Sequence, residues 1–132
     1  MRGVSFWFFA TATIYVAIGM VWGIVMSATM DHSLAPAHAH LNLIGWVTMG
    51  MFGLYYHNVP EAAETHLAKF HFGVSTLGLL MIVPGIVMAL RQEGETLAKA
   101  GSVLTVLSML IFVFTVFRNR GKAVRAAGRN RE

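Results

Sequence analysis

Four long apolar stretches are the feature that most constrains how this chain can fold. They run over residues 6–26, 38–56, 70–90 and 97–117, and none has an acidic or arginine side chain in its interior. A helix needs about 20 apolar residues to cross the hydrocarbon core of a bilayer. Backbone amides in lipid must be hydrogen-bonded within the protein, so these stretches are expected to form helices. The sequence therefore predicts an all-α integral membrane protein, a bundle of four transmembrane helices.

The composition agrees with a chain that lies almost wholly in the bilayer. Charged residues make up 12% of the 132 residues, and the mean hydropathy is +0.62, whereas soluble domains carry about 25% charged residues. The length suits a single domain, 1–132. Together these values exclude an ordinary soluble enzyme and a disordered chain. Because the sequence contains no cysteine, disulfides, thiolate metal sites and cysteine catalysis are also excluded.

The basic residues indicate the orientation of the helices. Six of the ten lysines and arginines lie in the tail 118–132, and the positive-inside rule places such a tail in the cytoplasm. Four spans then put the N-terminus inside as well, with the 27–37 and 91–96 loops outside and the 57–69 loop inside. A contact with nucleic acid or anionic lipid is the alternative for these charges, but topology alone accounts for them. We expect no nucleic-acid partner.

This orientation divides the six histidines into two groups. His32, His38 and His40 lie at the outer side, and His57, His66 and His71 at the inner side. On a helix, residues two positions apart point about 200° apart, so His38 and His40 cannot chelate one metal ion together. They suit two partners on opposite faces.

The inner histidines leave two interpretations open. An imidazole at a span edge often only hydrogen-bonds to a loop carbonyl, which suits His57 and His66. His71 lies deeper, and it is either structural or a ligand or proton-relay residue, since ionisable groups within a membrane are costly and tend to be functional.

The second apolar stretch carries a specific pattern. It contains His40 and, two residues later, Asn42. Then follow an aromatic residue, glycines, a tyrosine pair and a Val-Pro-Glu sequence, here Trp46, Gly50, Gly53, Tyr55, Tyr56 and 59–61. This pattern resembles the second helix of the heme-copper oxidase superfamily large subunit, in its nitric oxide reductase and C-type oxidase branch. The resemblance covers about residues 38–61, and the spacing from His40 to Trp46 is one residue shorter than in that family.

The resemblance implies a heme protein of the bacterial inner membrane. In the family, the histidine that matches His40 is an axial ligand of a low-spin heme near the outer face. The His38-x-His40 arrangement also resembles a later pair whose two histidines serve hemes on opposite faces of one helix. His40 is therefore the expected iron ligand, with His38 second, His71 a weaker candidate, and Asn42 a residue that orients a ligand. Any heme is heme b, bound non-covalently, because there is no cysteine for attachment.

The chain departs from the family in ways that bear on its activity. The large subunits have about twelve helices arranged as three four-helix arcs, and this chain matches one arc. It has no adjacent histidine pair for copper, no histidine–tyrosine cross-link motif and no acidic residue in mid-membrane. One chain therefore cannot form a complete heme–copper centre. A symmetric trimer could rebuild three arcs, with His40 of one copy and His38 of the next on one heme; a dimer that shares a heme is the alternative.

Three classes of function follow from these features. The first is a membrane heme b protein for electron transfer or heme-based redox chemistry, which exchanges electrons with a quinol or a soluble carrier. The second is a binder of another metal, chiefly copper, because imidazole suits copper and the nine methionines supply soft ligands. The third is an accessory or assembly subunit of a respiratory complex. A bound chromophore on the protein purified alone would distinguish the first class from the third.

Overall fold

The computed structural model describes residues 1–121, and all regular secondary structure in this part of the chain is helical. Three long helices, α1, α5 and α6, are joined by a rod of shorter segments. The bounds are α1 Gly3–Thr29, α2 Ala35–His40, η1 Leu41–Thr48, α3 Met49–Asn58, α4 Pro60–Ala63, α5 His66–Leu90 and α6 Thr96–Arg118. The predicted all-α class is thus confirmed for the described residues.

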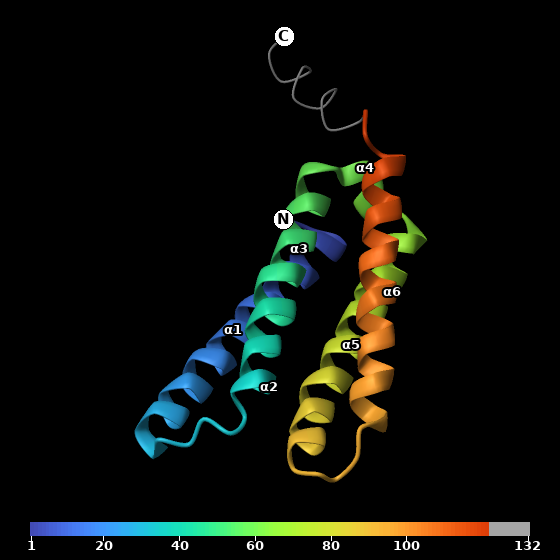
Figure 1. The fold of residues 1–132 in the computed structure, drawn as a ribbon. Helices are drawn as coiled ribbons and strands as arrows, with labels where there is room; N and C mark the ends of the chain where they lie inside the picture. Colours follow the sequence, from blue (N-terminus) through green and yellow to red (C-terminus); the bar gives the residue numbers. More distant parts are fainter. Residues whose placement is uncertain (122–132) are drawn as a thin grey trace.

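The helices form two hairpins that lie side by side (Figure 1). In the first, α1 packs along the rod made of α2, η1 and α3; in the second, α5 packs along α6. The start of α1, the end of α3, the start of α5 and the end of α6 lie at one end of the molecule. The loops that follow α1 and α5 lie at the other end.

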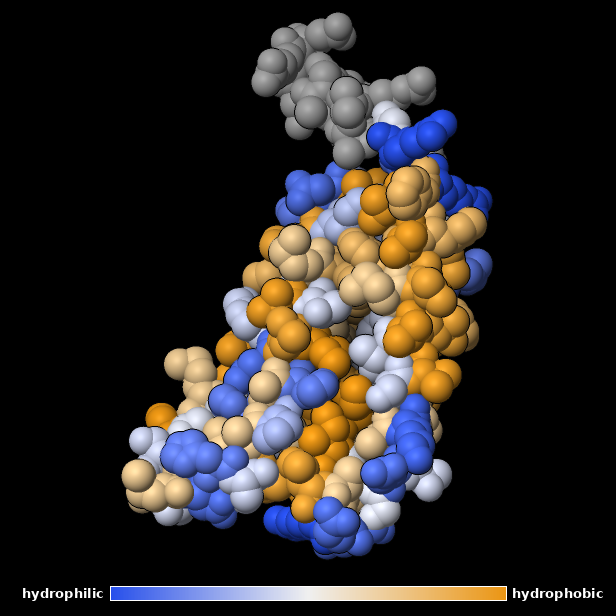
Figure 2. All heavy atoms as spheres, in the orientation of Figure 1, coloured by the Kyte–Doolittle hydropathy of each residue, from blue (hydrophilic) through white to orange (hydrophobic). Residues whose placement is uncertain are grey.

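The long helices have the length and apolar character of membrane spans. By these two criteria, α1, α5 and α6 can each cross a bilayer. Apolar side chains cover most of the middle of the face shown in Figure 2, and hydrophilic ones gather mainly at the two ends. Among residues 1–121, twenty-six large apolar side chains would otherwise face water, which a soluble monomer rarely tolerates. These observations support a membrane protein.

The second predicted span, 38–56, differs from a plain α-helix. It is divided among α2, the π-helix η1 and α3, which follow one another without a gap and keep right-handed helical backbone angles at both junctions. Within η1 the Thr48 hydroxyl donates a hydrogen bond to the Leu43 carbonyl, five residues earlier (3.0 Å). A π-helical turn is rare and is often found at functional sites.

Local sequence explains where the helices begin and end. Proline lies in the first turn of both α2 and α4, where its missing N–H costs nothing. The Thr65 hydroxyl caps α5 by accepting a hydrogen bond from the Ala68 N–H. After α1 the chain turns at Met30 with φ of 55°, and between α5 and α6 it turns at Gly94 with φ of 128°, a conformation that favours glycine.

The two hairpins meet around a buried aromatic cluster. Phe8 of α1 and Phe52 of α3 pack edge-to-face, with ring centroids 5.6 Å apart. His71 of α5 lies 4.6 Å from the Phe52 ring and 5.1 Å from the Phe8 ring. Phe112 of α6 completes the cluster, 4.4 Å from Phe52. The core of the molecule is therefore centred on a histidine.

Candidate functional site

His40 lies where α2 passes into η1, and its two ring nitrogens are in different situations. The Nδ1–H donates a hydrogen bond to the Pro36 carbonyl, 2.7 Å away and one turn earlier. No hydrogen bond to Nε2 is formed within residues 1–121. A backbone carbonyl that holds Nδ1–H fixes the tautomer and leaves Nε2 as an electron-pair donor, the usual arrangement of a metal-ligating histidine. His40 can therefore offer one oriented nitrogen to an external group.

His38 faces the other way, into the contact with α1. Its Nε2 lies 2.9 Å from the Gly19 carbonyl oxygen and 3.1 Å from the Asn42 Nδ2. Trp22 packs edge-on against the ring, with centroids 5.9 Å apart. The opposed directions expected for His38 and His40 are thus present, but here His38 has its partners within the chain.

Asn42, expected to orient a ligand, lies beside His38. Its buried Oδ1 has no hydrogen-bond partner within the described residues, and it contacts the Cα side of Gly19, where a β-carbon would clash with it. Gly19 therefore allows α1, His38 and Asn42 to approach one another.

Replacing Gly19 with alanine tests this contact. Because the new methyl group must displace the Asn42 amide, we expect Gly19→Ala to lower the free energy of unfolding by about 1–3 kcal/mol, the usual range for overpacking. Gly50→Ala is the matched control, since a β-carbon there would lie 3.9 Å from its nearest neighbours. Unfolding titrations in mixed micelles measure both changes, and equal stabilities of the two variants would contradict the assignment.

His71 is the most enclosed of the histidines, with no exposed surface. The Tyr56 hydroxyl lies 2.9 Å from its Nδ1, and the Ser108 hydroxyl lies 3.2 Å from its Nε2. Ser75, one turn after His71, lies 2.6 Å from Ser108 and donates a hydrogen bond to the His71 carbonyl. Both ring nitrogens thus have partners within the chain. This arrangement favours a structural or relay residue over an open ligand.

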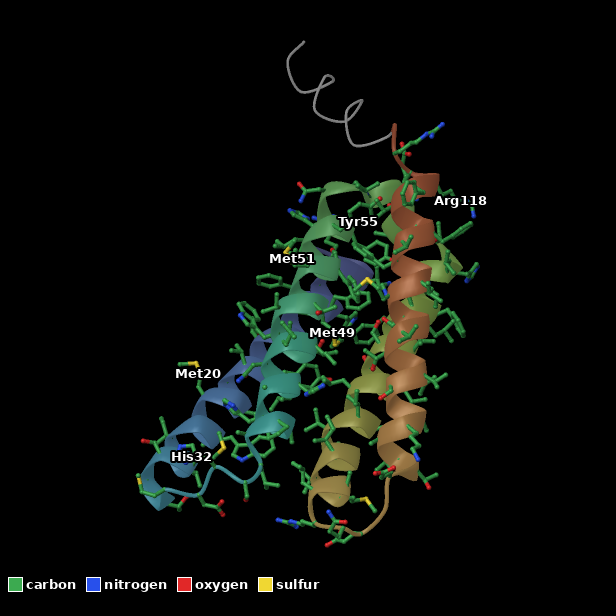
Figure 3. The ribbon with its side chains drawn as sticks, in the orientation of Figure 1. Met20, His32, Met49, Met51, Tyr55 and Arg118 are labelled. Carbon is green, nitrogen blue, oxygen red and sulfur yellow. The ribbon has the colours of Figure 1, made fainter. Side chains whose placement is uncertain are left out.

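The other histidines lie on the surface. His32 is exposed in the loop between α1 and α2, and His57 and His66 are exposed at the opposite end. Figure 3 shows His32 at the end of the molecule far from Arg118. Beside His32, hydrogen bonds from the Ser33 side chain and backbone hold the pKa of the Asp31 carboxyl below its ordinary value, so Asp31 is ionised and bound locally.

The copper alternative has no cluster of histidine and carboxylate ligands among residues 1–121. No group of three or more histidine, aspartate and glutamate side chains lies close enough to hold one metal ion there. The methionines are scattered. Met20 and Met51 are exposed, whereas Met49, at the start of α3, is buried (Figure 3). Part of the basic tail, 122–132, lies outside the described residues.

The candidates that the sequence suggested did not include three residues of the central cluster. These are Ser75, Ser108 and Tyr56, the last in its role as a partner of His71. Only the spacing of His71 and Ser75, four apart on one helix face, could have indicated a pair. Comparison of the chain with known protein families, with curated proteins and with solved structures gave no significant match. The site must therefore be interpreted from its own chemistry.

Proposed function

We propose that this chain is a small membrane heme b-binding protein for electron transfer or heme-based redox chemistry, with His40 as an axial ligand of the iron. The observation that carries the proposal is the Nδ1 hydrogen bond of His40 to the Pro36 carbonyl, which leaves Nε2 without a partner in the described chain. The π-helix that begins directly after His40 adds support. The resemblance of residues 38–61 to the second helix of the heme-copper oxidase large subunit supports the choice of heme.

The surroundings of His40 suit a macrocycle. The exposed side chains that follow it along the rod are apolar: Leu43, Val47 and Met51. A heme bound there would supply one-electron redox chemistry, and two imidazole ligands would saturate its iron, which favours electron transfer over gas chemistry.

One chain offers one such open imidazole, so the proposal includes a homo-oligomer, with a trimer favoured and a dimer as the alternative. The second ligand would come from His38 of a neighbouring copy. For this, His38 Nε2 must leave its contacts with Gly19 and Asn42. His71 is the weakest ligand candidate, because both of its nitrogens are bound within the core.

The proposed setting is the bacterial inner membrane. The rod 35–58 forms the remaining span beside α1, α5 and α6, so that both termini are cytoplasmic and His40 lies near the outer face. A quinol or a soluble electron carrier would exchange electrons with the heme. An accessory subunit of a respiratory complex remains the competing function, and it requires no heme on the isolated chain.

The test is a reduced-minus-oxidised visible spectrum with a pyridine hemochrome count on protein purified from heme-replete cells. We expect a sharp low-spin heme b spectrum in the wild type, its loss in His40→Ala, and its retention in His57→Ala, the matched change of an exposed histidine. His38→Ala and the mass of the detergent-solubilised oligomer then test the shared ligand. A colourless wild-type protein, or full heme in His40→Ala, would overturn the proposal.

A further inference from the structure

A cavity of about 230 Å³ lies between the two hairpins, where η1 and α3 face α6. Its wall is mostly apolar, with Leu43, Met49, Phe52, Val106 and Met109 among the lining residues. Leu43 and Val106 are about 60% exposed (61% and 60%), so the cavity opens between lipid-facing side chains. A molecule that enters it must come from the hydrocarbon layer.

Four hydroxyl groups interrupt the apolar wall. Those of Thr48, Ser75 and Thr105 donate to carbonyl groups of their own helices, at 3.0, 2.7 and 2.8 Å. Ser108 makes no such bond within the described chain. Its hydroxyl instead lies 2.6 Å from the Ser75 hydroxyl and 3.2 Å from His71 Nε2. Of the four hydroxyls, Ser108 is thus the one that does not donate its proton to a backbone carbonyl.

The hydrogen bonds among Tyr56, His71 and Ser108 decide whether the Ser108 proton can be donated to a ligand. When Tyr56 O–H donates to His71 Nδ1, the neutral ring carries its proton on Nε2 and donates to Ser108 Oγ. Because Ser75 uses its own proton on the His71 carbonyl, Ser108 O–H donates to Ser75 Oγ in the absence of a ligand, and a ligand acceptor must draw that proton into the cavity. In the opposite tautomer, Ser108 must donate to Nε2 and has nothing left for a ligand. Tyr56 and His71 are therefore positioning residues for Ser108.

We propose that this cavity binds the ring headgroup of a lipid-soluble quinone, with one ring carbonyl accepting a hydrogen bond from Ser108. The volume suits a single ring, since sites for drug-sized ligands take about 300–1,000 Å³. The Phe52 ring in the wall favours a flat conjugated group. No basic side chain lines the cavity, so an anionic lipid headgroup fits poorly, and an acyl chain has no acceptor for Ser108.

This site goes beyond the proposed heme function and does not depend on it. Its hydrogen-bonding residue, Ser108, lies on α6, and of the residues named beside His40 only Leu43 also lines the cavity. The probe is decylubiquinone, and binding to the full chain in lipid nanodiscs is measured by equilibrium dialysis. Decylbenzene, which has the tail and a ring without carbonyl groups, is the competitor. Every measurement is repeated on the His40→Ala chain, so that failure of heme binding and failure of quinone binding are distinguished.

We expect saturable binding of decylubiquinone that decylbenzene does not displace. Loss of one hydrogen bond should weaken it about five- to tenfold in Ser108→Ala, with a smaller loss in Tyr56→Phe, which frees the histidine tautomer. Ser102→Ala is the control, because this exposed serine on the same helix bonds only to Ala98. Val106→Trp, which fills the opening from an exposed position, should abolish binding without unfolding the chain.

Two results would overturn the proposal: displacement by decylbenzene, or equal affinity of Ser108→Ala and Ser102→Ala. Either would show that only an alkyl chain occupies the cavity.

Discussion

Gly101→Ala is expected to destabilise the α5–α6 hairpin by about 3 kcal/mol, at the upper end of the range for overpacking. A β-carbon at Gly101 would lie 2.5 Å from the backbone nitrogen of Ile82 and 2.7 Å from its Cα. Gly85 meets α6 in the same way, since a β-carbon there would lie 2.6 Å from the Ala98 Cα. Because the obstructing atoms belong to the backbone, they cannot move aside as a flexible side chain would. The two helices must separate instead.

The matched control for this prediction is Gly73→Ala. Gly73 lies on α5, and a β-carbon there meets nothing within 4 Å. Alanine favours a helix over glycine by about 1 kcal/mol, so this variant should be as stable as the wild type or more stable. Unfolding titrations in mixed micelles, followed by circular dichroism, measure both. If Gly101→Ala melted like Gly73→Ala, the close approach of α5 and α6 would be wrong.

His71→Ala is expected to cost about 3–5 kcal/mol, as for the truncation of a large buried aromatic side chain. The change leaves a hole among the rings of Phe8, Phe52 and Phe112. It also removes the hydrogen bonds from His71 to the Tyr56 and Ser108 hydroxyls, each worth about 0.5–1.5 kcal/mol. Thermal unfolding in detergent should therefore shift strongly downward.

Two further variants make this second prediction specific. His66→Ala changes an exposed histidine on the same helix and should alter stability by less than about 0.5 kcal/mol. Tyr56→Phe removes one hydroxyl and keeps the ring, so it should cost about 1 kcal/mol and remain measurable if His71→Ala does not fold. A wild-type melting curve for Tyr56→Phe would mean that the Tyr56–His71 bond contributes nothing to stability.

The helical fold and its boundaries could largely be predicted from the sequence, because both depend on local properties. The apolar stretches 6–26, 70–90 and 97–117 lie within α1, α5 and α6. The turns fall within the predicted loops 27–37, 57–69 and 91–96. The stretch 38–56 was the exception in detail, since apolar content does not distinguish an α-helical turn from the π-helical one of η1.

The candidate site was only partly predictable. The two-residue spacing of His38 and His40 determines that they diverge, whatever surrounds them. It does not determine which nitrogen is open, because the partners of His38 include Gly19 on another helix. His71 was recognisable as unusual by its depth, but its partners Tyr56 and Ser108 lie 15 and 37 positions away.

By itself, then, the sequence determined that this is a helical chain with helices apolar enough to cross a membrane, and that His38 and His40, two positions apart, point in different directions. Both follow from energies and angles that accumulate residue by residue along one helix. Only the tertiary structure decided that His40 keeps an open nitrogen while His38 does not, that His71 is enclosed, and that a cavity lined by Ser108 lies between the hairpins. Those features depend on hydrogen bonds and contacts between distant segments, which only the packing of the helices brings together.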